Sequence, residues 1–223
     1  KKYEAAGIAG VCIEDKLYPK VNSFVPGKQE LAPLSDFVGK IMAAKNAQQS
    51  EDFLLIARVE ALIAESGMKE ALKRAHAYTD ASADAILIHS KRNNPDEIIS
   101  FCQKWNKRAP LVVVPTTYPM FHVDEMLELG ISMVIYANHG IRAAVKAIDQ
   151  VCSEIKKEGN LVSVNQKIAS MNEVFDLQGM AELKKAEKLY SKGKEDNLKV
   201  VIPAAGDPSY EKSMKDIVRG CPI

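Results

Sequence analysis

The sequence predicts an α/β protein whose strands form part of a (β/α)8 barrel of the TIM type. Short, continuously apolar runs alternate with longer amphipathic stretches, which is the pattern of parallel strands buried on both faces and joined by helices. Polar and ionisable residues directly follow each apolar run. The chain has 223 residues, of which 47% are hydrophobic and 26% charged, so it is long enough to bury one sizeable core.

The first two strand and helix pairs are separated by connections of different length. A predicted strand at 9–13 ends before Glu14 and is followed by a loop that contains Pro and Gly and reaches the predicted helix at 33–47. A loop of this length at a barrel mouth is typical of a lid. The second predicted strand, 53–57, is followed after a short polar segment by a helix at 68–79, whose apolar residues recur at helical spacing.

The third predicted strand, 85–88, leads to a helix at 95–106. The segment Asn94-Pro95-Asp96-Glu97 supplies a capping side chain, a first-turn proline and acidic residues, all of which favour a helix N-terminus. Two further strands are predicted at 111–114 and 133–136, each an unbroken apolar run. They are followed by predicted helices at 122–129 and at 141 to about 157.

The alternation ends after residue 157, and the remaining chain predicts a different organisation. Residues 172–190 indicate one or two helices, and the charged segment 191–198 is a predicted linker. A new apolar strand begins at residue 199. The predicted domains are therefore a partial barrel with C-terminal helices at 1–190, the linker at 191–198, and the start of a further domain at 199–223.

A repeat of strands and helices closes either as a barrel or as an open doubly wound sheet. The charged residues at the strand ends favour the barrel, because all strand C-termini converge on one mouth there. Connections of this kind are often polar in an open sheet as well. No GxGxxG or Walker-type loop follows any strand, which weakens the dinucleotide-binding and P-loop alternatives.

Composition excludes several classes of protein. A formal net charge of +1 gives no overall field to attract nucleic acid or an anionic membrane. The four cysteines are widely spaced, so neither a zinc site nor a disulfide framework is predicted. No apolar run approaches the ~20 residues that span a bilayer. Reduced thiols indicate a cytoplasmic protein.

Candidate site residues lie in the long loop and at the strand ends. Lys20, Asn22, Arg58 and His89 supply donors suited to a phosphoryl or carboxylate group. Structural roles remain open for each: a solvated loop for Lys20 and its neighbour Lys16, a turn for Asn22, and a core position for His89. Glu14 either holds a metal, directly or through water, or pairs with Arg58 or Lys16.

At these residues the sequence resembles a known family. Pro19-Lys20-Val21-Asn22-Ser23 and the segments 4–16, 56–61, 83–90, 114–116 and 136–139 closely resemble motifs of the isocitrate lyase and phosphoenolpyruvate mutase superfamily, in family order, and the resemblance covers roughly residues 1–190. Lyases of that superfamily carry a cysteine in this loop, which is absent here. The loop resembles that of the mutases, whereas phosphonopyruvate hydrolase typically has threonine where Asn22 stands.

The resemblance implies an isomerase of phosphonate biosynthesis, a Mg2+-dependent phosphoenolpyruvate mutase that interconverts phosphoenolpyruvate and phosphonopyruvate. It implies that Arg58, His89, Asn22 and Ser23 bind the migrating phosphoryl group and that Lys20 acts from the closing loop. Glu14 would orient a Mg2+-bound water. A homotetramer is also implied. The alternatives are a phosphonopyruvate hydrolase and a non-catalytic fragment.

The family's main metal ligands lie in an Asp-x-Asp-x-Gly-type motif on an earlier strand, which this sequence lacks. We therefore expect the five strands to be strands 4–8 of a barrel, in a sequence that begins partway through a larger protein and lacks its principal aspartate ligands. The tail at 200–206 resembles, more weakly, the first strand of nucleotidyltransferases.

Overall fold

The computed structural model describes residues 1–20, 22–23 and 29–190. The chain divides into two compact units, Lys1–Val145 and Lys146–Ile223, which we describe separately. The predicted linker at 191–198 and the predicted strand and domain at 199–223 lie outside the described residues.

The first unit is built on a five-stranded parallel sheet whose order follows the sequence. Its strands are β1 (Gly10–Glu14), β2 (Leu54–Val59), β3 (Ala85–Ile88), β4 (Leu111–Val113) and β5 (Ile131–Val134). The register places Glu14 of β1 beside Arg58 of β2. Since all strands run in the same direction, their carboxyl ends lie along one edge.

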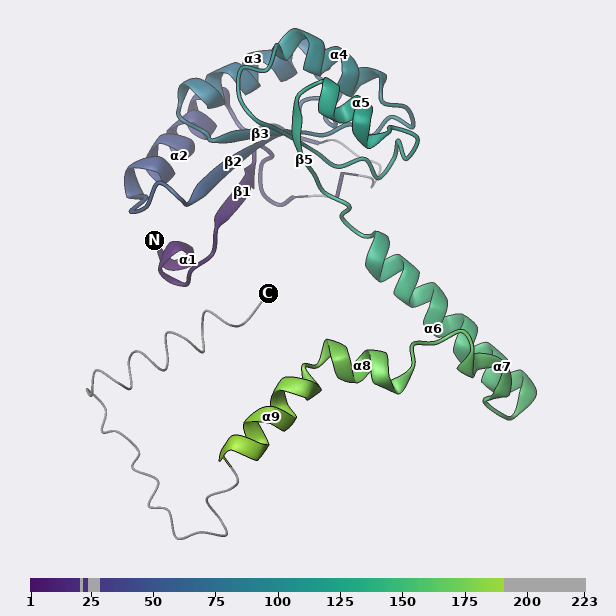
Figure 1. The fold of residues 1–223 in the computed structure, drawn as a ribbon. Coiled ribbons are helices and arrows are strands. Elements are labelled where there is room, and N and C mark those ends of the chain that lie inside the picture. Colours follow the sequence, from purple (N-terminus) through teal and green to yellow (C-terminus); the bar gives the residue numbers. More distant parts are fainter. Residues whose placement is uncertain (21, 24–28, 191–223) are drawn as a thin grey trace. The chain divides into compact units, whose positions relative to one another are not determined.

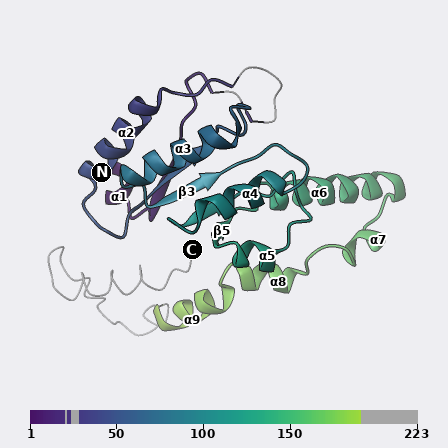
Figure 2. The same ribbon diagram turned by 90° about the horizontal axis from the view of Figure 1, so that it is seen from above.

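Four helices cover one face of this sheet, as Figures 1 and 2 show. They are α2 (Leu34–Ala47), α3 (Gly67–Asp80), α4 (Asp96–Trp105) and α5 (Val123–Glu128). The main core lies between the two layers, where β2 contributes Leu55, Ala57 and Val59 and helix α4 contributes Phe101 and Trp105. Burial of this apolar surface is what holds helices and sheet together.

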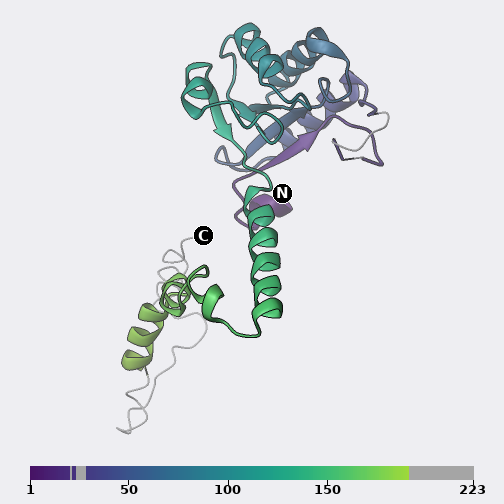
Figure 3. The same ribbon diagram turned by 90° about the vertical axis from the view of Figure 1, so that its right-hand side faces the viewer.

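The opposite face of the sheet carries a smaller apolar cluster. Ala85 and Leu87 of β3 pack with Val112 and Val114, and Ile56 of β2 packs against them. Figure 3 shows this face from the side, without a covering layer of helices from the first unit. Side chains that alternate between two apolar faces explain why the strands are continuously apolar in the sequence.

The α/β class and the parallel sheet are confirmed, but a closed barrel is not. In the part of the chain that the structure describes, the sheet is open and has β1 and β5 at its edges. Five strands are too few to close a barrel of the TIM type, which needs eight. Within these residues the architecture is therefore an open parallel sheet covered by helices on one face.

The predicted elements are confirmed in type, with shifted ends. Arg58, predicted to follow the second strand, lies within β2 instead. The fifth strand begins two residues earlier than predicted, directly after Gly130, whose φ of +81° ends the preceding turn. The short helices α1 (Lys2–Ala5) and α7 (Val162–Asn165) were not predicted, because four residues carry too little periodicity.

The second unit is helical in its described part. Helix α6 (His139–Glu158) runs into it and is followed by α7, α8 (Met171–Leu177) and α9 (Met180–Tyr190). Ser170 and Glu173 form a capping box at the start of α8. The predicted helical segment 172–190 is thus two helices, separated at Gly179, whose φ is +67°. No helix in the described ranges combines the length and apolar character needed to cross a membrane.

Candidate active site

The carboxyl ends of β1, β2 and β3 bring distant charged residues together. Glu14 is the last residue of β1, Arg58 is the penultimate residue of β2, and His89 follows β3 directly. The loop after β1 returns Lys20 and Ser23 to the same place. With Lys16 and Glu60, four of these residues form a network of contacting side chains, which we call the strand-end cluster: Glu14, Lys16, Lys20, Ser23, Arg58 and Glu60.

The more exposed part of the strand-end cluster is centred on Glu14. Its Oε1 lies 3.2 Å from the Lys20 ammonium, and its Oε2 lies 3.4 Å from Nε of Arg58. The Arg58 side chain is 25% exposed and lies at the edge formed by the carboxyl ends of the strands, which we call the open edge. The predicted alternative of a Glu14–Arg58 pair is thus observed, and Lys20 takes the place that was considered for Lys16.

The inner part of the cluster is centred on Glu60, which is fully buried. One carboxylate oxygen accepts a hydrogen bond from Nε of Arg58. The other lies 3.2 Å from the Lys16 ammonium and accepts a hydrogen bond from the Ser23 hydroxyl at 3.1 Å. Arg58 also donates from Nη2 to the Ser23 hydroxyl at 3.2 Å. Three cations against two carboxylates leave the cluster with one excess positive charge, which suits an anion.

Two ionisable groups have shifted pKa values. Burial alone would raise the pKa of the Glu60 carboxyl, but Arg58, Lys16 and His89 together hold it below its usual range. The pKa of His89 is lowered from 6.5 to about 4, chiefly by burial; Arg58 and Lys16 act in the same direction, and Glu60 and Glu14 in the opposite one. The Glu60 carboxylate is therefore ionised and the His89 imidazole neutral at pH 7.

The His89 shift predicts a loss of stability in acid. Above pH 6.5 neither the folded nor the unfolded state protonates this imidazole; between pH 6.5 and 4 only the unfolded state takes up the proton. The free energy of unfolding should therefore fall by on the order of 3 kcal/mol over this window. Urea unfolding at pH 7 and pH 4.5 measures it, with His89→Gln as the control. Equal acid sensitivity of both proteins would contradict the shift.

A second buried network lies beneath the cluster and is centred on Asp15, which has no exposed surface. Its carboxylate accepts hydrogen bonds from the backbone N–H of Glu60 at 2.9 Å, from the Tyr78 hydroxyl at 2.6 Å and from Arg74 at 3.1 Å. Arg74 donates as well to the carbonyl of Ala32, at the end of the long loop. Asp15 thereby joins the end of β1, the residue after β2 and helix α3.

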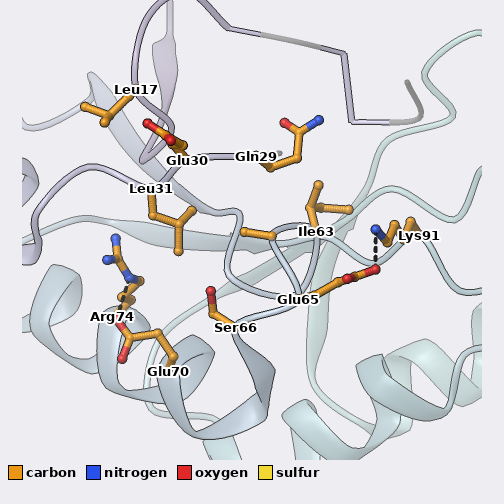
Figure 4. A pocket seen from close by; sticks show the side chains of 11 residues that line it. Leu17, Gln29, Glu30, Leu31, Ile63, Glu65, Ser66, Glu70, Arg74 and Lys91 are labelled. Carbon is orange, nitrogen blue, oxygen red and sulfur yellow. Dashed lines mark hydrogen bonds and ion pairs between the residues drawn. The ribbon is translucent and has the colours of Figure 1, made fainter. Parts of the chain in front are cut away.

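A polar hollow of about 860 Å3 lies beside this network, shown in Figure 4. Its cations are already paired with carboxylates: Arg74 Nε with Glu70 at 2.8 Å, and Lys91 with Glu65 at 2.7 Å. Neither Glu14, Arg58 nor His89 is among the residues that line it. We therefore place the candidate active site at the strand-end cluster and not in this hollow.

The fit of a metal ion depends on Glu14. In residues 1–20, 22–23 and 29–190, no group of three or more His, Cys, Asp or Glu side chains is arranged to hold a metal ion. Glu14 is the acidic member of the cluster that is partly exposed, at 19%. Mg2+ keeps several waters and takes few carboxylates. Glu14 could therefore hold a metal-bound water, but it does not by itself form a complete metal site.

The predicted residues do not all meet in the same way. Glu14, Lys20, Ser23 and Arg58 are joined by direct contacts, and His89 lies close enough for the charges of the cluster to act on its pKa. Asn22 is exposed, and its backbone carbonyl accepts a hydrogen bond from the Gln29 side chain at 3.4 Å.

Sequence reasoning missed two organising residues, Glu60 and Asp15. The signal for both was present, since an acidic residue attached to a buried apolar run requires a partner. The partners themselves were not identifiable, because Arg74 and Tyr78 are about 60 residues away from Asp15 in the chain.

Comparison with known proteins identifies the family of the chain. A family model described as phosphoenolpyruvate phosphomutase matches residues 1–156. The phosphoenolpyruvate phosphomutase of Tetrahymena pyriformis is 51% identical over 191 residues, which are 85% of this chain and 64% of that protein. The chain thus spans less than two thirds of the length of this relative.

Solved structures show the same fold. The crystal structure of phosphoenolpyruvate phosphomutase from Streptomyces platensis subsp. rosaceus matches with a TM-score of 0.82 and 50% identity, over 85% of this chain and 66% of that one. A phosphonopyruvate hydrolase in complex with oxalate and Mg2+ matches with a TM-score of 0.77 and 43% identity, over 85% and 65%. By its sequence and its fold, the chain belongs to the phosphoenolpyruvate phosphomutase family.

Proposed function

We propose that the protein is an isomerase that interconverts phosphoenolpyruvate and phosphonopyruvate. The observation that carries the proposal is the strand-end cluster, in which Arg58, Lys16 and Lys20 outnumber the two carboxylates beside a neutral His89. Loose phosphoryl transfer depends on positioning and positive electrostatics, and it requires little covalent chemistry from the protein. Relatives of the same family carry this activity in their names.

The roles follow from the position of each side chain. Arg58, with its guanidinium at the open edge, binds phosphoryl oxygens, as do Ser23 and Asn22 from the loop. His89 donates a hydrogen bond as a neutral imidazole, which adds no charge that the buried surroundings disfavour. Lys20 moves its ammonium group from Glu14 to the substrate when the loop closes.

The reaction breaks the P–C bond of phosphonopyruvate and leaves the electron pair with the pyruvate enolate. The metaphosphate-like group then bonds to the enolate oxygen, which gives phosphoenolpyruvate, so atoms and electrons balance without a co-reactant. The role of Arg58, His89, Ser23 and Asn22 is to hold the phosphoryl oxygens in place during this transfer.

Mg2+ is the proposed cofactor, and Glu14 is the residue of this chain that would hold one of its waters. The chemistry that Mg2+ supplies in such a site is the stabilisation of negative charge on an enolate oxygen. The phosphonopyruvate hydrolase that shares this fold was crystallised with Mg2+ and oxalate. The remaining ligands are proposed to come from aspartates on strands that precede this sequence.

A hydrolase is the second candidate, favoured by the 43% identity to that phosphonopyruvate hydrolase. In that case a water attacks the metaphosphate-like group, and phosphate and pyruvate are the products. Water exclusion at the cluster separates the two reactions. We favour the mutase because Asn22 stands at the position where phosphonopyruvate hydrolase typically has threonine.

The wider setting of the sheet belongs to the same proposal. We take β1–β5 to be strands 4–8 of a (β/α)8 barrel in a protein of phosphonate biosynthesis that works in the cytoplasm as a homotetramer. Support comes from the two open edges of the sheet and from the apolar inner face around Leu87 and Val112. The partial barrel at 1–190 and the start of a further domain at 199–223 are part of the same proposal.

Removal of the metal tests the function and the cofactor together. With the full-length enzyme and phosphonopyruvate as substrate, formation of phosphoenolpyruvate is followed by 31P NMR, and free pyruvate with lactate dehydrogenase, which needs no Mg2+. We expect phosphoenolpyruvate to form, EDTA to lower the rate to background, and excess Mg2+ to restore it. Trp105 fluorescence should not change, because the described fold packs around apolar residues. Pyruvate without phosphoenolpyruvate would indicate the hydrolase, and full activity in EDTA would exclude the metal.

A further inference from the structure

We infer that Glu60 is a positioning residue. It sets the direction of the Arg58 guanidinium and binds the beginning of the loop after β1 to the end of β2. This inference rests on the proposed function. Glu60 does not face the open edge, since its carboxylate is completely buried, and so it acts through Arg58, Lys16 and Ser23.

The two oxygens of Glu60 have separate partners. Oε1 accepts from Nε of Arg58, while Oε2 accepts from the Ser23 hydroxyl at 3.1 Å and pairs with Lys16 at 3.2 Å. Arg58 comes from β2, whereas Lys16 and Ser23 come from the loop after β1. One carboxylate therefore holds an arginine of the sheet and two positions of the loop.

The direction of the guanidinium follows from the contact at Nε. Nε donates to Glu60 and also lies 3.4 Å from Oε2 of Glu14, while Nη2 donates to the Ser23 hydroxyl at 3.2 Å. Among the described residues, Glu14 is the other carboxylate that pairs with Arg58, and it remains when Glu60 is replaced. The fork of donors would then turn toward Glu14 and away from the position in which it binds phosphoryl oxygens.

The position of Glu60 is itself fixed from below. Its backbone N–H donates to Asp15 at 2.9 Å, and Asp15 is held by Tyr78 at 2.6 Å and Arg74 at 3.1 Å. Tyr78 is buried and packs against Phe37 with ring centroids 4.7 Å apart. Tyr78→Phe removes a buried hydrogen bond but leaves Asp15 bound to Arg74 and to the Glu60 N–H, so the position of Glu60 is kept and the variant is a matched control for general loss of stability.

Kinetics of Glu60→Gln, Glu60→Asp and Tyr78→Phe in the full-length enzyme test the inference. Glu60→Gln keeps the size but offers one acceptor oxygen and places an amide donor next to a cation. We expect kcat to fall by about 10- to 100-fold, as for other residues that orient a binding group, and the share of free phosphate among the products to rise. Glu60→Asp should restore part of kcat, and Tyr78→Phe should keep it within about threefold of the wild type.

A second readout does not depend on turnover. The Arg58 Nε–H, identified in 1H–15N NMR spectra by its loss in Arg58→Lys, should be protected from exchange in the wild type and should change its chemical shift in Glu60→Gln, where Glu14 replaces the buried carboxylate as its acceptor. An unchanged kcat in Glu60→Gln, an equal loss in Tyr78→Phe, or an unchanged Nε–H signal would overturn the positioning role. A wild type that turns over no phosphonopyruvate while its Nε–H is protected would instead overturn the proposed function.

Discussion

Replacing Arg58 with glutamine is expected to lower kcat for phosphonopyruvate by about 1000-fold, the size of effect seen when a donor to developing charge is removed. Arg58 is the guanidinium of the strand-end cluster, and it reaches the open edge while its Nε is bound to Glu60. Glutamine supplies neither the charge nor the planar fork of donors that fits a phosphoryl group. Steady-state kinetics of the variant measure the effect.

Two further variants separate the geometry of Arg58 from its charge. Arg58→Lys retains a cation beside the buried Glu60 carboxylate and should still lose about 100-fold in kcat, because an ammonium cannot form two parallel hydrogen bonds. Arg108→Gln changes an exposed arginine paired with Asp80, outside the cluster, and should leave kcat unchanged. If Arg58→Lys retained the wild-type kcat, a guanidinium would not be needed and the proposed role of Arg58 would be wrong.

Asp15→Ala is expected to have the largest effect on stability, a loss of about 3–5 kcal/mol in the free energy of unfolding. The substitution leaves the Arg74 guanidinium without its buried counter-charge and leaves the Tyr78 hydroxyl and the Glu60 N–H without their acceptor. Urea unfolding followed by Trp105 fluorescence measures the loss. The chain has one tryptophan, and it is buried in the first unit, so the signal reports that unit.

The control for this prediction is an Asp–Arg ion pair that is exposed to solvent on the protein surface. Asp80 pairs with Arg108 at the surface, where the two side chains are 64% and 40% exposed. Asp80→Ala should cost less than about 1 kcal/mol, because solvent screens the pair and both groups remain hydrated. Similar losses in Asp15→Ala and Asp80→Ala would show that burial of the Asp15 network does not determine its contribution.

The order and type of the main elements were predictable from the sequence, because the apolar runs and amphipathic stretches follow different periods. The same pattern indicated that Glu14, Arg58 and His89 lie close together, since the carboxyl ends of parallel strands share one edge. Closure of the sheet was not predictable from these residues. It depends on how many strands pair around the axis, and the local pattern of each strand is the same in an open and a closed sheet.

The interior of the candidate site was also beyond the sequence. The charge of Glu60 was visible, but its role depends on the loop that brings Lys16 and Ser23 to it. The pairing of Asp15 with Tyr78 and Arg74 depends on how helix α3 packs over β2 and β3. Spacing along the chain specifies neither contact, because both join segments that are distant in the sequence.

The most direct test of the central claim is 31P NMR of the full-length enzyme with phosphonopyruvate and Mg2+ in water enriched in 18O. If the strand-end cluster holds the phosphoryl group and excludes water, the phosphoenolpyruvate signal should appear with no 18O in its three non-bridging phosphoryl oxygens. Only the bridging oxygen, which comes from the exchangeable ketone of phosphonopyruvate, can carry label from water. An 18O-shifted phosphate signal with no phosphoenolpyruvate would contradict the mutase and identify a hydrolase instead.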